Sequence, residues 1–378
     1  MGFIFTVCQV GAESALKSEI AGGYPNLKFA YSRPGFLTFK AGDGGSGEPE
    51  PDFILRTVFA RAYGLSIGKA ARPEEAFAHA RQLAARFGSK PRLHVFERDA
   101  FAPGDETKDY VMGAQSRQAL DVLRRSAEFE PSFAVSPEPV AGDVVLDLIY
   151  LDPDCWWLGY HRHTAHHSPW PGGQPEIAEP ALAPSRAYLK LEEAIRWSSA
   201  PVRAGDVAIE IGSAPGGASF ALLERGLDVI GIDPADMAES VRAFGPTRFK
   251  HLKKPAAQVR RNELPDVAHW ILLDMNVAPV ISLNTVERIA PWFQDSLQGL
   301  VLTLKLNEWK HAAEIPKLLR RVEKLGMARI RASQLASNKQ EICVVALTRA
   351  GVARRPGLRP APASPSDPSN SRSRPRKP

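Results

Sequence analysis

Hydrophobic and polar positions follow a regular alternation in the second half of the chain. From residue 207 onward, short apolar runs alternate with stretches in which apolar residues recur every three or four positions. These patterns predict strands at 207–211, 228–232, 271–275, 300–306 and 342–347, and helices at 217–225, 285–296 and 311–324. Apolar strands that alternate with amphipathic helices favour a mostly parallel sheet covered on both faces.

The first half mixes the two kinds of element without this alternation. Its patterns predict strands at 3–8, 36–39, 92–96 and 144–151, helices at 12–20, 53–65, 73–87 and 116–127, and a Gly/Pro-rich loop at 41–51. This half therefore predicts an α+β arrangement, and it contains no motif that points to a chemistry.

The stretch Cys155–Gly173 differs from its surroundings because it carries three tryptophans, four histidines and two prolines. Its position predicts a connection between two domains, which either packs through its tryptophans or stacks on unpaired RNA bases. The spacing of the histidines between His161 and His167 does not match a structural zinc pattern, so we expect no metal. A helix is expected next, at 184–197, with Ser185 as its N-cap.

The net charge of +6 lies at one end of the 378-residue chain. Residues 351–378 hold seven basic residues and one acidic residue, which account for the whole excess, so the remainder is neutral. This Pro/Ser/Arg-rich segment has little to bury, and we expect a disordered basic tail. A nucleic-acid surface on the body would be a local patch, such as 248–261, which is equally compatible with a solvated face.

Several features predict a cytoplasmic protein without a membrane span. No apolar run approaches the ~20 residues that cross a bilayer, and the N-terminus lacks the basic segment of a signal peptide. The three cysteines are far apart in the sequence, which favours reduced thiols.

A glycine-rich loop follows the first strand of the alternating half, in the sequence AIEIGSAPGGASFALLERGLDVIGIDP. Gly212, Gly216 and Gly217 allow a tight turn and the close approach of a ligand to the backbone. The next strand ends at Asp233, whose carboxylate can accept both ribose hydroxyls of an adenosine. A dinucleotide site needs GxGxxG for its pyrophosphate, whereas this loop contains Pro215, so the details favour S-adenosylmethionine over NAD.

Four charged residues are expected to meet beside this loop. Asp274 and Lys305 each close an apolar strand, and the carboxyl ends of parallel strands meet at one edge of a sheet. A last strand running antiparallel would bring Glu341 to the same edge, and Lys190 lies in the preceding helix. Each residue taken alone would more readily be a solvated charge at the end of an element. Together they predict a buried lysine with a lowered pKa, which would suit the deprotonation of a ribose hydroxyl.

At these positions the chain resembles a known family. SRAYLKLEEA, IGSAPGGAS, GIDPADM, LDMNVAP, LTLKLNEWK and ASNKQEICVVAL occur in the order found in the RrmJ/FtsJ-like ribose 2′-O-methyltransferases, which carry a Lys-Asp-Lys-Glu tetrad. HSPW and APSRAYLKLEEA resemble most the bacterial large-subunit rRNA cytidine 2′-O-methyltransferases of the RlmM type. The resemblance is good over roughly 160–348 and loose in the first half.

The resemblance implies an α/β fold with a Rossmann-like methyltransferase domain. Its sheet would be seven-stranded and mostly parallel, with the last strand antiparallel. An α+β ferredoxin-like segment and a THUMP-like RNA-binding module would precede it. The expected boundaries are a ferredoxin-like segment at 1–50, a THUMP-like module at 51–160, a linker at 161–183, the methyltransferase domain at 184–350 and the tail at 351–378.

The resemblance also assigns roles. Lys305 would be the general base, and Lys190, Asp274 and Glu341 would complete the tetrad. The cofactor S-adenosylmethionine would be contacted by Ser185, Gly212, Ala214, Pro215, Gly216, Gly217, Asp233 and Asp274. The expected partner is RNA, and more specifically large-subunit rRNA, with the protein acting as a monomer and without a metal.

One position departs from the family. The family usually has an acid after the strand that ends at Asp233, for the adenine amino group, and here that segment has Pro255. This departure keeps open an RNA-binding protein with a degenerate cofactor site. A third class, the NAD-dependent oxidoreductases, offers no role for the tetrad.

Overall fold

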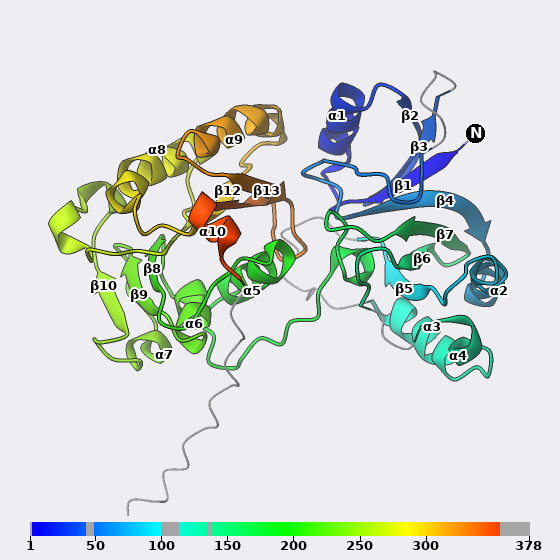
Figure 1. Cartoon of the computed structure of the whole chain (residues 1–378), viewed down its shortest axis with the longest axis horizontal. Coiled ribbons are helices and arrows are strands. Elements are labelled where there is room, and N and C mark those ends of the chain that lie inside the picture. Colours follow the sequence, from blue (N-terminus) through cyan, green and yellow to red (C-terminus); the bar gives the residue numbers. More distant parts are fainter. Residues whose placement is uncertain (1, 43–48, 100–112, 135–137, 356–378) are drawn as a thin grey trace, which may run out of the picture.

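The described part of the chain is an α/β structure with two mixed sheets of seven strands each, one in each half of the chain (Figure 1). The structure is a computed structural model that describes residues 2–42, 49–99, 113–134 and 138–355. Most of the predicted loop at 41–51 and the predicted tail from residue 356 onward lie outside the described residues. No helix in the described part of the chain has the length and apolar character to span a bilayer.

The first sheet runs through both predicted N-terminal segments. Its strands lie in the order β2 (Leu27–Arg33), β3 (Phe36–Ala41), β1 (Phe3–Val7), β4 (Ala62–Ala70), β7 (Cys155–Arg162), β6 (Val144–Asp152) and β5 (Arg92–Glu97). The pair β5–β6 is parallel and the other pairs are antiparallel. Its helices are α1 (Glu13–Gly23), α2 (Pro73–Ala84), α3 (Ala114–Arg124) and α4 (Phe129–Ser132). The pairing of β1 with β4 joins the residues on either side of the boundary expected at residue 50.

The second sheet has a parallel centre. Its strands lie in the order β10 (Phe249–Leu252), β9 (Asp228–Ile232), β8 (Val207–Ile211), β11 (Trp270–Asp274), β12 (Gly299–Lys305), β14 (Glu341–Leu347) and β13 (Arg329–Ser333). Strands β8 to β12 are mutually parallel, and β14 is antiparallel to both of its neighbours. The helices are α5 (Ala187–Ser198), α6 (Gly217–Glu224), α7 (Glu239–Arg242), α8 (Pro279–Ile289), α9 (Ile315–Glu323) and α10 (Arg349–Ala353).

Helices cover both faces of the second sheet. Side chains of α8 and α9, such as Leu283 and Leu318, pack on one face, and those of α5 and α6, such as Leu191 and Leu222, pack on the other. The cluster under α8 and α9 continues into the first half, where it includes residues such as Phe59. The hydrophobic core therefore connects the two halves of the chain.

Two predictions for the first half are wrong. The helix expected at 53–65 is absent: 53–61 are irregular and β4 begins at Ala62. Gly64 explains the strand, because a Cβ there would lie 2.7 Å from the Tyr160 carbonyl oxygen of the neighbouring strand. The connection expected at 155–173 begins as β7, an interior strand of the sheet in which Trp156 and Trp157 are buried in different clusters.

Corrections at element ends follow from local chemistry. The expected helices at 285–296 and 311–324 are α8 and α9, and each begins near a proline, Pro279 or Pro316, which fits only the first turn of a helix. Residue Arg186, and not Ser185, is the N-cap of α5. The short edge strands β2, β10 and β13 escaped prediction because their sequences are polar or only briefly apolar.

The tail begins later than expected. Residues Arg349–Ala353 form α10, and the guanidinium of Arg354 donates to both carboxylate oxygens of Asp206, at 2.7 and 2.8 Å. Asp206 also accepts a hydrogen bond from the indole of Trp270. The chain is thus anchored to the second half up to Arg354.

Candidate functional site

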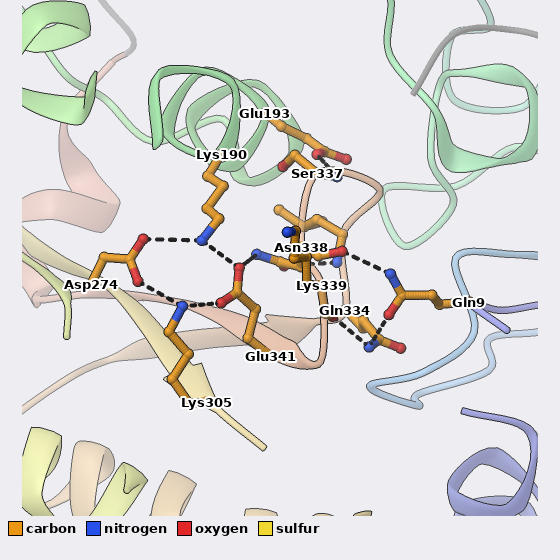
Figure 2. Close-up of polar contacts among 11 residues, drawn as sticks. Gln9, Lys190, Glu193, Asp274, Lys305, Gln334, Ser337, Asn338, Lys339 and Glu341 are labelled. Carbon is orange, nitrogen blue, oxygen red and sulfur yellow. Dashed lines mark hydrogen bonds and ion pairs between the residues drawn. The ribbon is translucent and has the colours of Figure 1, made fainter. Parts of the chain in front are cut away.

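Four elements bring the two lysines and two carboxylates of the expected tetrad together (Figure 2). Lys305 ends β12 and lies opposite Glu341, the first residue of β14, because those strands run antiparallel in that register. Asp274 ends β11, which is the neighbour of β12 on its other side. Lys190 reaches the same point from the first half of α5.

The four charges form a closed ring of ion pairs. Lys190 Nζ lies 3.1 Å from an Asp274 oxygen and 2.5 Å from Glu341 Oε1. Lys305 Nζ lies 3.2 Å from the other Asp274 oxygen and pairs with Glu341 Oε2. Glu341 is buried, whereas the side chains of the two lysines and Asp274 are about one-fifth exposed, at 18%, 19% and 21%. The ring is therefore open to a ligand on the side of Asp274 and the lysines.

The expectation of a lowered pKa for Lys305 is wrong. Burial lowers the pKa of this ammonium, but the carboxylates of Asp274 and Glu341 outweigh burial, and the pKa of Lys305 is raised. Conversely, burial raises the pKa of Glu341, and the two lysines outweigh it and hold that pKa below its ordinary value. With both carboxylates in place, Lys305 is a cation.

The glycine loop lies between β8 and α6, next to Asp274. At Gly212 the backbone has φ +80°, and an added Cβ would lie 2.5 Å from the carbonyl oxygen of Asp274. The loop continues through a cis peptide between Ala214 and Pro215 and through Gly216, the N-cap of α6. The sharp turn therefore places bare backbone against the end of β11.

Asp233 closes the loop from the end of β9. Its carboxylate accepts hydrogen bonds from the backbone nitrogens of Ala214, at 3.1 Å, and Ala235, at 2.8 Å. Ser185 lies on the far side of the loop, where a Cβ on Gly217 would collide with its hydroxyl. The residues expected to contact the cofactor thus surround one loop, although the N-cap role expected for Ser185 is wrong.

The departure at Pro255 lies at the same edge of the sheet. Pro255 follows β10, the parallel neighbour of β9, and precedes a 3-10 turn at Ala256–Gln258. The basic residues around it are engaged locally, since Lys253 pairs with Asp236 and Lys254 pairs with Glu263. These contacts favour a structural face over a phosphate-contacting patch for this stretch.

Glu210 is a buried acid that the sequence patterns did not single out. It lies in β8, its carboxylate accepts a hydrogen bond from the Ser219 hydroxyl of α6, and burial raises its pKa to about 8. Glu210 lines the same small pocket as Lys190, Asp274 and Asn338. A single carboxylate inside the otherwise apolar strand VAIEI was the available signal.

The histidines between His161 and His167 lie away from the tetrad, in and after β7 of the first sheet. His161 Nδ1 lies 2.8 Å from Asp147, and the ring of His161 stacks on that of His167 at 4.5 Å. Among the described residues, no three His, Cys, Asp or Glu side chains are grouped as a metal ion would require. His161, His163 and His167 are buried and belong to the core of the first sheet, whereas His166 is exposed.

The chain is similar to proteins named Ribosomal RNA large subunit methyltransferase M. The protein of that name from Tolumonas auensis is 32% identical over 223 residues, which cover 56% of this chain and 59% of the relative. The one from Alkalilimnicola ehrlichii is 34% identical over 186 residues, 47% of this chain and 49% of the relative. These two matches span about half the length of the relatives. The one from Actinobacillus pleuropneumoniae serotype 5b is 25% identical over 354 residues, 89% of this chain and 95% of the relative.

Other comparisons are less specific. No protein-family model matches the chain. Among solved structures, TrmN from Thermus thermophilus matches 92% of this chain and all of its own, with 13% identity and a TM-score of 0.34. A TM-score of this size carries no argument about fold or function.

Proposed function

We propose that this protein methylates a ribose 2′-hydroxyl of RNA with S-adenosylmethionine as the methyl donor. The observation that supports this most is the ring formed by Lys190, Asp274, Lys305 and Glu341 beside the glycine loop. The neutral form of a lysine beside the glycine loop can accept a proton from a hydroxyl group, after the ammonium group has lost its own proton.

The loop and its surroundings fit the cofactor. At Gly212 and Gly217 a side chain would collide with Asp274 or Ser185, so glycine lets the loop pack closely between the end of β11 and the segment before α5. Asp233 at the end of β9 would accept the ribose hydroxyls of the adenosine, and Asp274 would contact the cofactor from β11. When bound, S-adenosylmethionine supplies an electrophilic methyl group.

Each residue of the ring would have a separate role in the reaction. Lys305 would take the proton from the 2′-hydroxyl, which makes the oxygen a nucleophile. Asp274 and Glu341 each bind both lysines, so they hold the two ammonium groups apart in fixed positions. Lys190 would keep Asp274 and Glu341 oriented and add a positive charge near the developing alkoxide. No metal is needed for these steps.

We propose large-subunit rRNA as the substrate, with cytidine as the target nucleotide. The similarity to proteins named Ribosomal RNA large subunit methyltransferase M supports the rRNA, and cytidine follows from the family resemblance. The first half, as a ferredoxin-like and THUMP-like module, would hold the RNA while the second half carries the reaction.

The substitution Lys305→Ala tests the base assignment. We expect methyl transfer to fall by at least about a thousandfold, while S-adenosylmethionine binding by calorimetry changes by less than about threefold. Lys305 contacts Asp274 and not the glycine loop, which is why affinity should persist. Retained activity would refute the assignment. Absence of binding heat from the unaltered protein at millimolar cofactor would favour an RNA-binding protein with a degenerate site.

The substrate is tested by mapping 2′-O-methyl groups on rRNA from cells with and without the protein. One cytidine of the large-subunit rRNA is expected to lose its mark and regain it when the unaltered protein, but not Lys305→Ala, is restored. An unchanged map would contradict the proposed substrate.

A further inference from the structure

A buried loop joins β13 to the tetrad residue Glu341. It runs from Gln334 to Gln340, and the residues Gln334, Asn338 and Glu341 are each at most 2% exposed. Inside the loop, the backbone nitrogen of Leu335 donates to Asn338 Oδ1 at 3.0 Å. The Asn338 side chain therefore has a fixed orientation.

The first half of the chain holds this loop through Gln9, which follows β1. The amide nitrogen of Gln9 donates to the carbonyl oxygen of Asn338 at 2.8 Å, although 329 residues separate the two in sequence. The amide oxygen of Gln9 accepts from Gln334 Nε2 at 2.5 Å, and the backbone nitrogen of Gln334 donates to the Val58 carbonyl at 2.8 Å. Gln334 and Asn338 of the loop are thus bonded to the first half.

Helix α5 holds the same loop from the opposite side. The carboxylate of Glu193 accepts from the backbone nitrogens of Ala336 and Ser337, at 2.9 and 2.7 Å. Glu193 lies three residues after Lys190 in α5, so one helix both positions a tetrad lysine and fixes the loop (Figure 2).

The loop reaches the tetrad by a short path. Asn338 Nδ2 lies 3.5 Å from Glu341 Oε1, the same oxygen that pairs with Lys190. The backbone nitrogen of Glu341 donates to the Lys339 carbonyl at 2.8 Å, which fixes the start of β14. Glu341 is the tetrad member with the least exposure, so its orientation depends on these buried neighbours.

We propose that Gln9 and Asn338 are positioning residues, through which the first half of the chain orients Glu341 and so sets the positions of the Lys190 and Lys305 ammonium groups. This inference rests on the proposed function and extends it, because the first half then contributes to the reaction as well as to RNA binding. Neither Gln9 nor Asn338 touches the reacting atoms.

Two substitutions separate positioning from folding. Gln9→Met keeps the length of the side chain and removes both of its hydrogen bonds to the loop. Asn338→Asp keeps the acceptor for Leu335 and replaces the amide that faces Glu341 by a carboxylate. Phe59→Leu is the matched control, because Phe59 packs on Trp309 between the two halves without contacting the loop residues that the proposal invokes.

Each variant is measured for kcat, KM for S-adenosylmethionine, RNA affinity and melting temperature. We expect Gln9→Met and Asn338→Asp to lower kcat by between about tenfold and about a hundredfold, with KM and RNA affinity within about threefold of the unaltered protein. Phe59→Leu should lower the melting temperature and leave kcat within about threefold. Unchanged kcat in folded Gln9→Met and Asn338→Asp would overturn the proposal. A decrease of kcat in all three variants in proportion to the decrease in melting temperature would overturn it as well.

A measurement that does not depend on enzymatic activity distinguishes failure of this proposal from failure of the proposed function. Lysine side-chain NMR follows the titration of Lys305 in the full-length chain. Gln9→Met should release Glu341 from the Lys305 ammonium group and lower its titration midpoint, whereas Asn338→Asp adds a negative charge and should raise the midpoint. Midpoints equal to those of the unaltered protein in both variants would overturn the positioning role. If the unaltered protein transfers no methyl group, the proposed function fails. The titration midpoints still show whether Gln9 and Asn338 influence Lys305 through Glu341.

Discussion

A lysine that acts as a base must lose its proton before it can accept one, and the surroundings of Lys305 oppose that loss. Burial alone would favour the neutral amine, but Asp274 and Glu341 both contact the ammonium group and raise its pKa. The ring of charges therefore keeps Lys305 protonated, and only a small fraction of the molecules has a neutral Lys305 that can act as a base at neutral pH.

This charge state predicts how the rate depends on pH. Because the pKa of Lys305 lies above its ordinary value, the neutral fraction grows throughout the range below that pKa. We expect kcat for methyl transfer to rise about tenfold per pH unit from about pH 7 to about pH 9, without a plateau. In Glu341→Gln one of the two stabilising carboxylates is lost, so the pH dependence should shift to lower pH. A rate that is flat or falls over this range would contradict Lys305 as the base.

Gly212 offers a second prediction at the scale of one residue. Gly212→Ala must place a Cβ at φ +80° and 2.5 Å from the Asp274 carbonyl oxygen. Gly326→Ala is the matched control, because it has φ +83° and no heavy atom within 4 Å of an added Cβ. Both should lose about 1 kcal/mol of stability from the backbone conformation. Only Gly212→Ala should lose a further ~1–3 kcal/mol to crowding, together with cofactor affinity.

Denaturant unfolding and calorimetry measure these effects. Equal losses of stability in Gly212→Ala and Gly326→Ala, with unaltered cofactor binding, would show that the contact between the glycine loop and β11 does not shape the site.

At the scale of elements, the pattern of apolar positions predicted strands best where apolar residues are concentrated. Strands β8, β9, β11, β12 and β14 are buried on both faces, so their sequences are continuous apolar runs that a sequence pattern can identify. The edge strands β2, β10 and β13 lack this signal because their sequences are polar or only briefly apolar. Residues 53–65 were predicted as a helix because their apolar spacing is ambiguous, and the contacts of β4 with β1 and β7 decide in favour of a strand.

Strand β7 and the segment after it lead to a prediction about stability and pH. Burial lowers the pKa of His163 to about 4 and that of His167 to about 2, both below the ordinary value of 6.5. The unfolded chain therefore binds more protons than the folded chain below about pH 6.5, so the free energy of unfolding should fall as the pH decreases from there toward about pH 4. Each histidine contributes at most about 1.4 kcal/mol per pH unit.

His167→Asn tests this assignment. The asparagine oxygen can replace His167 Nδ1 as the acceptor for the backbone nitrogen of Thr164, while the titratable group disappears. Urea unfolding between about pH 8 and about pH 4.5 should show a shallower loss of stability in the variant. A variant whose free energy of unfolding declines as steeply as that of the unaltered protein would exclude His167 as a source of the dependence.

At the scale of the whole molecule, the two halves share one hydrophobic cluster and meet at the loop before Glu341. Sequence reasoning placed Asp274 and Lys305 together because the ends of parallel strands meet at one edge, which is a general property of such sheets. An antiparallel last strand added Glu341, and the family resemblance named all four residues as a tetrad. Sequence reasoning missed the contribution of Gln9 because nothing local relates a residue near the start of the chain to Asn338. Such long-range contacts depend on how the halves dock, and a pattern of apolar positions carries no information about docking.

The C-terminal segment divides into an anchor and a charged extension, and two truncations separate them. A chain that ends at Arg355 keeps the bonds between Arg354 and Asp206, whereas a chain that ends at Ala353 leaves the buried carboxylate of Asp206 without its guanidinium. We expect the first truncation to keep the stability of the full chain and the second to lose about 1–3 kcal/mol, measured by denaturant unfolding.

The same truncations test whether the extension contributes to RNA binding. Residues 356–378 hold five basic residues and one acidic residue, so the chain that ends at Arg355 loses most of the excess positive charge. If these residues neutralise RNA phosphates, the slope of log affinity against log salt should become shallower by up to about 3. Specific methyl transfer at low salt should persist, because the tetrad and the loop from Gln334 to Gln340 are untouched. An unchanged salt slope would mean that the extension makes no phosphate contacts, and that RNA affinity comes from the folded body, whose net charge is close to zero and whose basic groups must then be arranged as a local patch.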